Sequence, residues 1–155
     1  MGEHADPGQT GVKAGRVVGL LTALLLVVSL LRVRGDFVGR IESVVALFPF
    51  DPGPSVSVYF YLYVVGAAVT RYGICYVVGS LIGVVYDWLE QPSVAVVAGL
   101  ALVVGLADGF VAAFDTRSTL IAAGYVLSWL VFVPAFLYLG GEEESREEPL
   151  RVDDP

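Results

Sequence analysis

Four long apolar segments, separated by polar or charged residues, dominate the pattern of this chain. A helix that crosses a bilayer needs about 20 predominantly apolar residues. The sequence therefore predicts an all-α fold: a polytopic membrane protein with a four-helix transmembrane bundle over residues 16–140. The spans are expected at about residues 16–33, 56–88, 94–114 and 119–139.

The second segment is unusually long and contains one charge. Arg71 is the only charged residue between Val56 and Tyr86. A single helix over residues 56–88 would be about 50 Å long and would have to tilt or protrude from the hydrocarbon layer. We favour this single helix. The alternative is a protein with five spans, in which Arg71 to Gly73 forms a break between two shorter helices.

The connection between the first two spans contains a shorter apolar segment, Ile41 to Phe50. This segment is too short to cross a bilayer. It predicts an interfacial or bundle-packed half-helix, which Pro52 and Pro54 would end. A re-entrant, pore-lining loop is the alternative interpretation.

Composition adds information mainly at the two ends of the chain. Residues 1–15 are predicted to form a flexible N-terminal tail, and residues 141–155 a disordered acidic tail. The chain is 56% hydrophobic and has a net charge of −7. Because no basic patch is present to neutralise phosphates, nucleic acid is not an expected partner. Acidic ends of this kind are typical of proteins from halophilic organisms. The alternative is that they only increase the solubility of the chain ends.

Side chains that could bind a metal or act as nucleophiles are few. Cys75 is the only cysteine and His4 the only histidine. An intrachain disulfide is therefore impossible. Because His4 lies in the N-terminal tail, it cannot ligate zinc or haem between the spans. We expect no metal, no other cofactor and no catalytic residue.

Arg71 requires a partner, because an unpaired arginine at the bilayer centre costs at least about 2.5–3.5 kcal/mol. Arg71 lies 17 residues before Trp88, at the end of its span. Asp108 lies 15 residues after Ser93, at the start of the next. On adjacent antiparallel helices their depths would differ by only about 3 Å. A similar count along the last span places Tyr125 opposite Asp108. We therefore expect a buried network of Arg71, Asp108 and Tyr125, with the phenol donating to the carboxylate.

This network has two interpretations. It can hold the bundle together, since buried ionic groups often specify how helices pair. It can also line an ion, proton or solute path, as ionisable groups inside membranes often do.

Small residues predict close packing between the second and third spans. Gly79 and Gly83 form a GxxxG pair, and the next span carries a stripe of small residues, Ala98, Ala101, Gly105 and Gly109. Such faces let two helix backbones approach. Counting from the connecting turn places Gly79 near Leu102 and Gly83 near Ala98. Dimerisation through these residues is the alternative.

Aromatic residues gather at the start of the second span: Tyr59, Phe60, Tyr61 and Tyr63. Such residues are enriched where a helix meets the membrane–water interface. We expect them to form an interfacial belt; a substrate-stacking site is the alternative.

One short pattern resembles a catalytic motif. Tyr86-Asp87, followed by Gly105 to Asp108, is similar to the YD and GxGD pair of presenilin-type intramembrane aspartyl proteases. The resemblance would imply that Asp87 and Asp108 form a catalytic dyad. Ala107 stands where that family has glycine, and about 22 Å of helix separates the two acids. A dyad must share a proton over a few ångströms, so this activity is not expected.

The expected function is that of a small, non-enzymatic integral membrane protein: an accessory, scaffold or assembly subunit. The alternative is a small oligomeric transporter or channel that uses Arg71 and Asp108 in an ion or proton path. Its expected partners are the lipid bilayer and either a second copy of the chain or another membrane protein. We expect a multi-pass protein in the plasma membrane of a prokaryote. Its orientation is undetermined, because Lys and Arg divide evenly between the two sides.

Overall fold

The chain forms six α-helices in the part that the computed structural model describes, residues 7–47, 55–90 and 92–147. They are α1 (Pro7–Arg32), α2 (Arg34–Val45), α3 (Val56–Trp88), α4 (Val94–Thr116), α5 (Thr119–Leu130) and α6 (Phe132–Glu147). These residues contain no strand. Four units are long and apolar enough to cross a membrane: α1, α3, α4 and the segment Thr119–Gly140. The all-helical class and the four candidate spans agree with the sequence prediction.

The helix α3 is uninterrupted across Arg71 and Gly73. The alternative with five spans is therefore wrong. A break at this point would release backbone N–H and C=O groups, and an apolar surrounding offers them no other partner.

The helix α1 begins at Pro7, nine residues before the predicted span. The prediction of a flexible tail up to residue 15 is wrong from Pro7 onward, and residues 1–6 lie outside the described part. Gly11 and Gly15 are buried against α3. Because contact between the two backbones orders this segment, its low apolar content does not prevent it from folding.

The short helix α2 also differs from the predicted half-helix over residues 41–50. It spans Arg34–Val45, and the proline-containing connection that follows lies outside the described residues. Phe37 of α2 contacts Phe60 at the start of α3, with ring centroids 5.6 Å apart. The start of α2 is therefore fixed by aromatic packing, which the apolar run alone did not predict.

The fourth candidate span, Thr119–Gly140, is divided at Val131 into the helices α5 and α6. Pro134 has no N–H to donate to the carbonyl of Leu130, so the helix breaks one turn before the proline. α6 continues through Gly140 to Glu147. The prediction of disorder from residue 141 is therefore wrong as far as Glu147, in a segment rich in the good helix former Glu. Residues 148–155 lie outside the described part.

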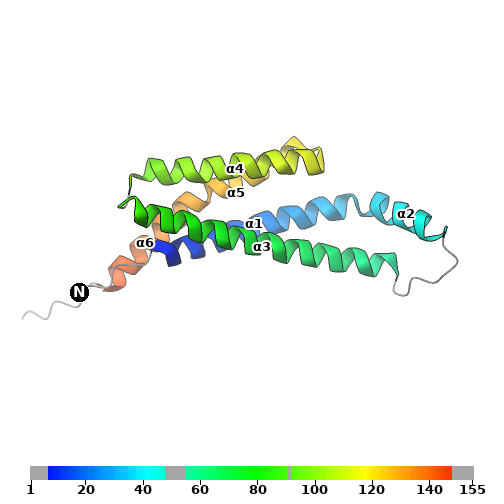
Figure 1. Ribbon diagram of the computed structural model, residues 1–155, viewed down its shortest axis with the longest axis horizontal. Coiled ribbons are helices and arrows are strands. Elements are labelled where there is room, and N and C mark those ends of the chain that lie inside the picture. Colours follow the sequence, from blue (N-terminus) through cyan, green and yellow to red (C-terminus); the bar gives the residue numbers. More distant parts are fainter. Residues whose placement is uncertain (1–6, 48–54, 91, 148–155) are drawn as a thin grey trace, which may run out of the picture.

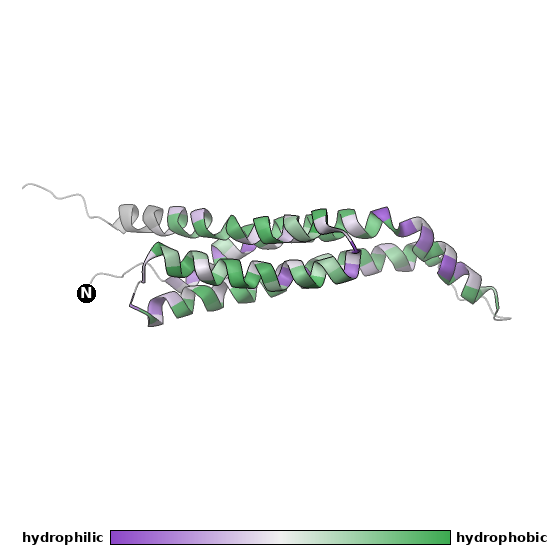
Figure 2. Ribbon diagram, turned by 90° about the horizontal axis from the view of Figure 1, so that it is seen from above, coloured by the Kyte–Doolittle hydropathy of each residue, from purple (hydrophilic) through white to green (hydrophobic). Residues whose placement is uncertain are grey.

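The helices assemble as two antiparallel pairs, α1 with α3 and α4 with α5 (Figure 1). The same view places the start of α1 and the end of α6 at the end of the molecule where α3 connects to α4. Apolar residues cover most of the long helices, and polar residues are concentrated on α2 and at the connections (Figure 2).

Glycines allow close packing between α1 and α3, the first helix pair. A Cβ atom on Gly79 would lie 2.5 Å from the carbonyl oxygen of Gly11 and 2.6 Å from Cα of Gly15. Gly83 makes a similar approach to the start of α1. The prediction that Gly79 and Gly83 pack against α4 is therefore wrong, since their partner is α1. Counting residues predicts the depth of a glycine but not which neighbouring helix it faces.

The small residues of α4 pack mainly against α5. A Cβ on Gly105 would lie 2.9 Å from Cβ of Trp129, and one on Gly109 would lie 2.9 Å from the carbonyl oxygen of Ala122. Ala101 is fully buried in the core where the two pairs meet, and Ala98 is half-buried. The predicted stripe is therefore a packing surface, but for a different helix.

Candidate functional site: a buried charge network between two helix pairs

The two charges inside the apolar segments meet between α3 and α4. Nη2 of Arg71 donates a hydrogen bond to Oδ2 of Asp108, and the pair forms a salt bridge. Their side chains are 17% and 13% exposed. The backbones of α3 and α4 make few contacts with each other. The ion pair therefore joins the two helix pairs through side chains rather than through close backbone packing.

Asp108 accepts a second hydrogen bond, from Nε1 of Trp129 on α5, at 2.9 Å. Sequence analysis missed Trp129. Trp129 lies one turn beyond Tyr125 on the same helix face, so a depth count accurate to one turn could have included it. An indole N–H can only donate a hydrogen bond. A tryptophan at the depth of an acid inside an apolar segment is therefore a candidate donor to that carboxylate.

Tyr125 belongs to the site but plays a different part from the predicted one. Its ring lies under the guanidinium of Arg71, with Cζ 4.8 Å from the ring centroid. This is a cation–π contact. No hydrogen bond from its phenol to Asp108 is formed, so that detail of the prediction is wrong. The ring is buried and covers one face of the cation.

Thr22 of α1 makes a polar contact with Cys75, which lies one helical turn after Arg71 on α3. Cys75 is fully buried. Its Sγ lies 3.4 Å from Oγ1 of Thr22, which itself donates to the carbonyl oxygen of Val18 at 2.9 Å. Nε of Arg71 is buried and makes no hydrogen bond within the described residues. The polar layer thus extends from α1 through α3 to α4 and α5.

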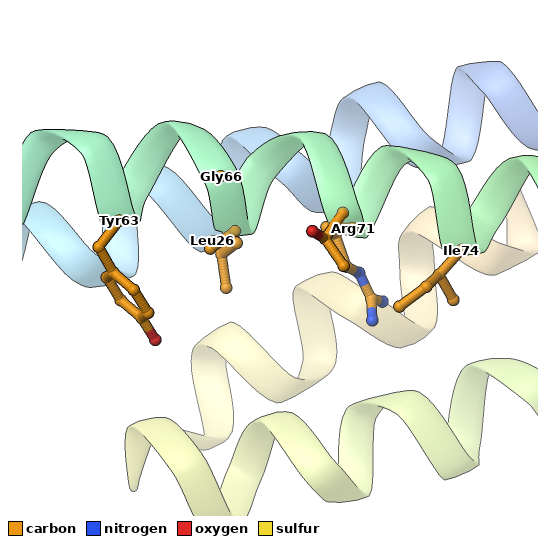
Figure 3. A pocket seen from close by; sticks show the side chains of 7 residues that line it. Leu26, Tyr63, Gly66, Arg71 and Ile74 are labelled. Carbon is orange, nitrogen blue, oxygen red and sulfur yellow. The ribbon is translucent and has the colours of Figure 1, made fainter.

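An open groove of ≈ 420 Å³ lies beside Arg71 along one face of α3. Its walls come mainly from α3, with Leu26 of α1 at one edge. In Figure 3 the Arg71 side chain extends from α3 toward the helices on the far side of the groove, and Tyr63 points in the same general direction. Arg71, Thr70 and Tyr63 are the polar residues of this lining, and the other four lining residues are apolar.

The two acids of the protease-like pattern do not form a dyad. Asp87 is exposed at the end of α3, whereas Asp108 is half-buried in the network within α4. The described residues contain no group of three His, Cys, Asp or Glu side chains that could hold a metal ion.

No family model, curated protein or solved structure matches this chain. Its function must therefore be inferred from the geometry. Chemically, the network is an ion pair with two aromatic partners, and both charged groups are engaged by residues of the same chain.

Proposed function

We propose that this chain is a multi-pass integral membrane protein that acts as a non-enzymatic accessory, scaffold or assembly subunit. The Arg71–Asp108 pair stabilises its bundle by joining the α1–α3 pair to the α4–α5 pair. Its partner is a second copy or another membrane protein, and its location is the plasma membrane of a prokaryote.

One observation carries this proposal: the two charges are paired with each other within the chain, although Nε of Arg71 makes no hydrogen bond among the described residues. Asp108 receives hydrogen bonds from Arg71 and Trp129, and the ring of Tyr125 covers the guanidinium. Charge-assisted hydrogen bonds are about twice as strong as neutral ones. An ion pair of this kind is suited to holding helices together, because neither charged group needs a ligand to balance its charge.

Energetics supports the same function. Removing one member of a buried ion pair typically costs about 3–5 kcal/mol, because the remaining charge is left unpaired. Replacing both members with apolar residues of similar volume is often neutral or stabilising. A purely structural pair should therefore be replaceable as a unit.

The groove beside Arg71 favours a second candidate, a small oligomeric transporter or channel. Arg71 lines this groove and is 17% exposed. An ion or proton path through the groove would use Arg71 and Asp108 directly.

The experiment that separates these functions uses the double variant Arg71→Met with Asp108→Leu. Wild type and variant are reconstituted in liposomes, and fluxes of H⁺, K⁺ and Cl⁻ are followed with fluorescent indicators. In parallel, each is isolated from native membranes in mild detergent with the proteins that accompany it.

The structural role predicts a folded double variant, no flux above that of empty liposomes for either protein, and the same accompanying proteins or oligomer for both. A wild-type flux that the double variant loses while remaining folded would instead support the transporter.

A further inference from the structure

A second cation, Arg16, lies within a candidate membrane span. Because α1 begins at Pro7, Arg16 is nine residues inside this helix rather than at the edge of the apolar segment. It is exposed, and its Cζ lies 5.5 Å from the centroid of the Tyr76 ring on α3. No carboxylate among the described residues forms an ion pair with it. Arg16 therefore differs from Arg71, whose charge is balanced by Asp108.

The contact with Tyr76 gives the level of this cation along the bundle. Tyr76 is five residues after Arg71 on α3, and the ion pair places Arg71 level with Asp108 on α4. At 1.5 Å per residue, the guanidinium of Arg16 is about 20 Å from the α4–α5 turn and about 14 Å from the start of α4. The hydrocarbon core of a bilayer is about 30 Å thick, close to the length of α4. If the bundle crosses a membrane as proposed above, this guanidinium therefore lies inside the hydrocarbon layer.

Apolar residues extend past Arg16 toward the α3–α4 connection. Residues 72–86 of α3 and 94–107 of α4 contain no charge. Leu81 and Val84, in the first of these segments, are exposed and would be left in water if the bilayer ended at the level of Arg16. Snorkelling would carry the charged end of an arginine toward water, whereas this guanidinium lies over an aromatic ring of α3. Its charge therefore needs an anion at this depth.

The face of α3 that carries Tyr76 points away from the charge network. With 100° per residue, Tyr76 lies about 140° around the helix from Arg71. Gly73, one turn before Tyr76, is exposed, and a Cβ atom on it would meet nothing within 4 Å. Gly66 and Ser80 lie seven residues before and after Gly73, and residues at this spacing lie nearly on one face. Small residues on an open face allow another helix to approach closely.

A second copy of the chain does not supply the missing negative charge. Asp108 is the acid within the described spans that lies nearest this depth, and it is already paired with Arg71. Asp87 and Asp115 lie near the ends of their helices. Two copies that met symmetrically through this face would bring their Arg16 side chains to the same level, where like charges repel. The complementary charge must therefore come from a different molecule.

We propose that the Arg16 face, made up of Arg16, Tyr76 and Gly73, binds a transmembrane helix of a different membrane protein. An Asp or Glu of that helix forms an ion pair with Arg16. Each charge then balances the other inside the hydrocarbon layer, as intramembrane ionisable groups commonly do, and Gly73 allows the two backbones to approach. This inference rests on the proposed accessory role and narrows it, since the partner is another membrane protein rather than a second copy.

A model transmembrane peptide tests the proposal. The probe is a leucine–alanine helix that is long enough to cross the bilayer and has one Glu at its midpoint. The matched peptide has Gln at the same position, so that only the charge differs. Full-length protein and peptide are reconstituted in phosphatidylcholine liposomes at neutral pH, and their association is measured by Förster energy transfer between a fluorophore on each.

We expect the Glu peptide to bind at least about fivefold more tightly than the Gln peptide. Arg16→Met should abolish this preference. Gly73→Leu should weaken binding of the Glu peptide by a similar factor, because the larger side chain prevents close approach. Arg32→Met is the matched control, an arginine at the other end of α1, and should behave as wild type.

Equal binding of the two peptides by wild type would overturn the proposal, as would an unchanged preference in Arg16→Met or an unchanged affinity in Gly73→Leu. Loss of the preference when phosphatidylglycerol replaces phosphatidylcholine would show that a headgroup phosphate neutralises Arg16, and would also contradict it. So would energy transfer between two labelled copies of the chain, without peptide, that Gly73→Leu abolishes, because it would show a homodimer on this face.

Circular dichroism checks that each variant folds. Arg16→Gln replaces Arg16→Met, and Gly66→Leu replaces Gly73→Leu, if either variant does not fold. Alkaline extraction of native membranes tests membrane integration separately, and the flux measurement described above tests the accessory role. Failure of the proposed function is therefore distinguishable from failure of the Arg16 face to bind an acidic helix.

Discussion

At the scale of single residues, Asp108 is the point where three helices meet through side chains. It accepts from Arg71 of α3 and from Trp129 of α5 while it lies on α4. A buried carboxylate with two donors is far less costly than an isolated one, because its charge is compensated by groups held in place. The stability of the bundle should therefore depend on each donor separately.

Removing the indole donor tests this dependence. Trp129→Phe keeps an aromatic ring in the core but deletes the N–H that binds Asp108. Because hydrogen bonds to charged groups contribute about 1.5–3 kcal/mol, the free energy of unfolding should fall by a similar amount. Titration with sodium dodecyl sulfate in mixed micelles measures it. Trp88→Phe, at a side chain that is 80% exposed, should change it by less than about 0.5 kcal/mol. An equal loss in the two variants would contradict this role of Trp129.

At the scale of the helices, the glycines of α3 divide into two groups. Gly79 and Gly83 contact the backbone of α1, whereas a Cβ on Gly66 or Gly73 would meet nothing within 4 Å. All four lie in one helix, so they differ in their neighbours rather than in their secondary structure. Close backbone packing needs glycine only on the inner face.

Alanine substitutions should separate these two groups. Gly79→Ala places a Cβ 2.5 Å from the carbonyl oxygen of Gly11, and since backbone atoms cannot yield, α1 and α3 must move apart. We expect a loss of at least about 1–3 kcal/mol, the usual range for overpacking. Gly73→Ala should be neutral or stabilising by up to about 1 kcal/mol, because alanine has the higher helix propensity. The same detergent titration measures both. If Gly79→Ala were as stable as Gly73→Ala, the pairing of α1 with α3 would be wrong.

Much of the helical architecture could be predicted from the sequence, because apolar length and helical rise are properties of one chain segment. The unbroken α3 and the common depth of Arg71 and Asp108 follow from such counting. The partner of Gly79 does not, because it depends on the rotation of each helix and on which helices are neighbours. The helical structure around Gly11 and Gly15 could not be predicted either, since it comes from contact with α3 rather than from local composition.

The same limit applies to Tyr125 and Trp129. Both lie on one face of α5, one turn apart, and a depth count cannot decide which of them reaches the carboxylate. Their roles depend on where the guanidinium lies, and that is fixed by packing between the two helix pairs. Hydrogen-bond partners at this level of detail require the three-dimensional arrangement.

At the scale of the whole molecule, a bundle with four spans predicts on which side of the membrane each connection lies. The α3–α4 connection should lie on the same side of the membrane as the start of α1, and the α4–α5 turn on the opposite side. In a Cys75→Ala background, Ser93→Cys and Ser118→Cys should therefore react with a membrane-impermeant maleimide from opposite sides. Ser43→Cys on α2 should react from the same side as Ser118→Cys. Labelling of Ser93→Cys and Ser118→Cys from one side would contradict the four-span topology.

The two helix pairs are held together by their shared apolar core and by the charge network. The core includes Ala101 and Trp129 from the second pair and Val18 and Cys75 from the first, together with Phe132 of α6. Apolar packing is tolerant of small shifts, whereas an ion pair fixes one alignment. The Arg71–Asp108 ion pair should therefore determine how the two helix pairs are positioned relative to each other.

The most direct test of this account is a double-mutant cycle on the pair, with Arg71→Met, Asp108→Leu and the double variant unfolded by detergent titration. We predict that each single variant loses about 3–5 kcal/mol of unfolding free energy, and that the double variant loses less than either. Losses in the single variants that add in the double variant to within about 0.5 kcal/mol would show that the two residues act independently, and would contradict a buried pair joining the two halves of the bundle.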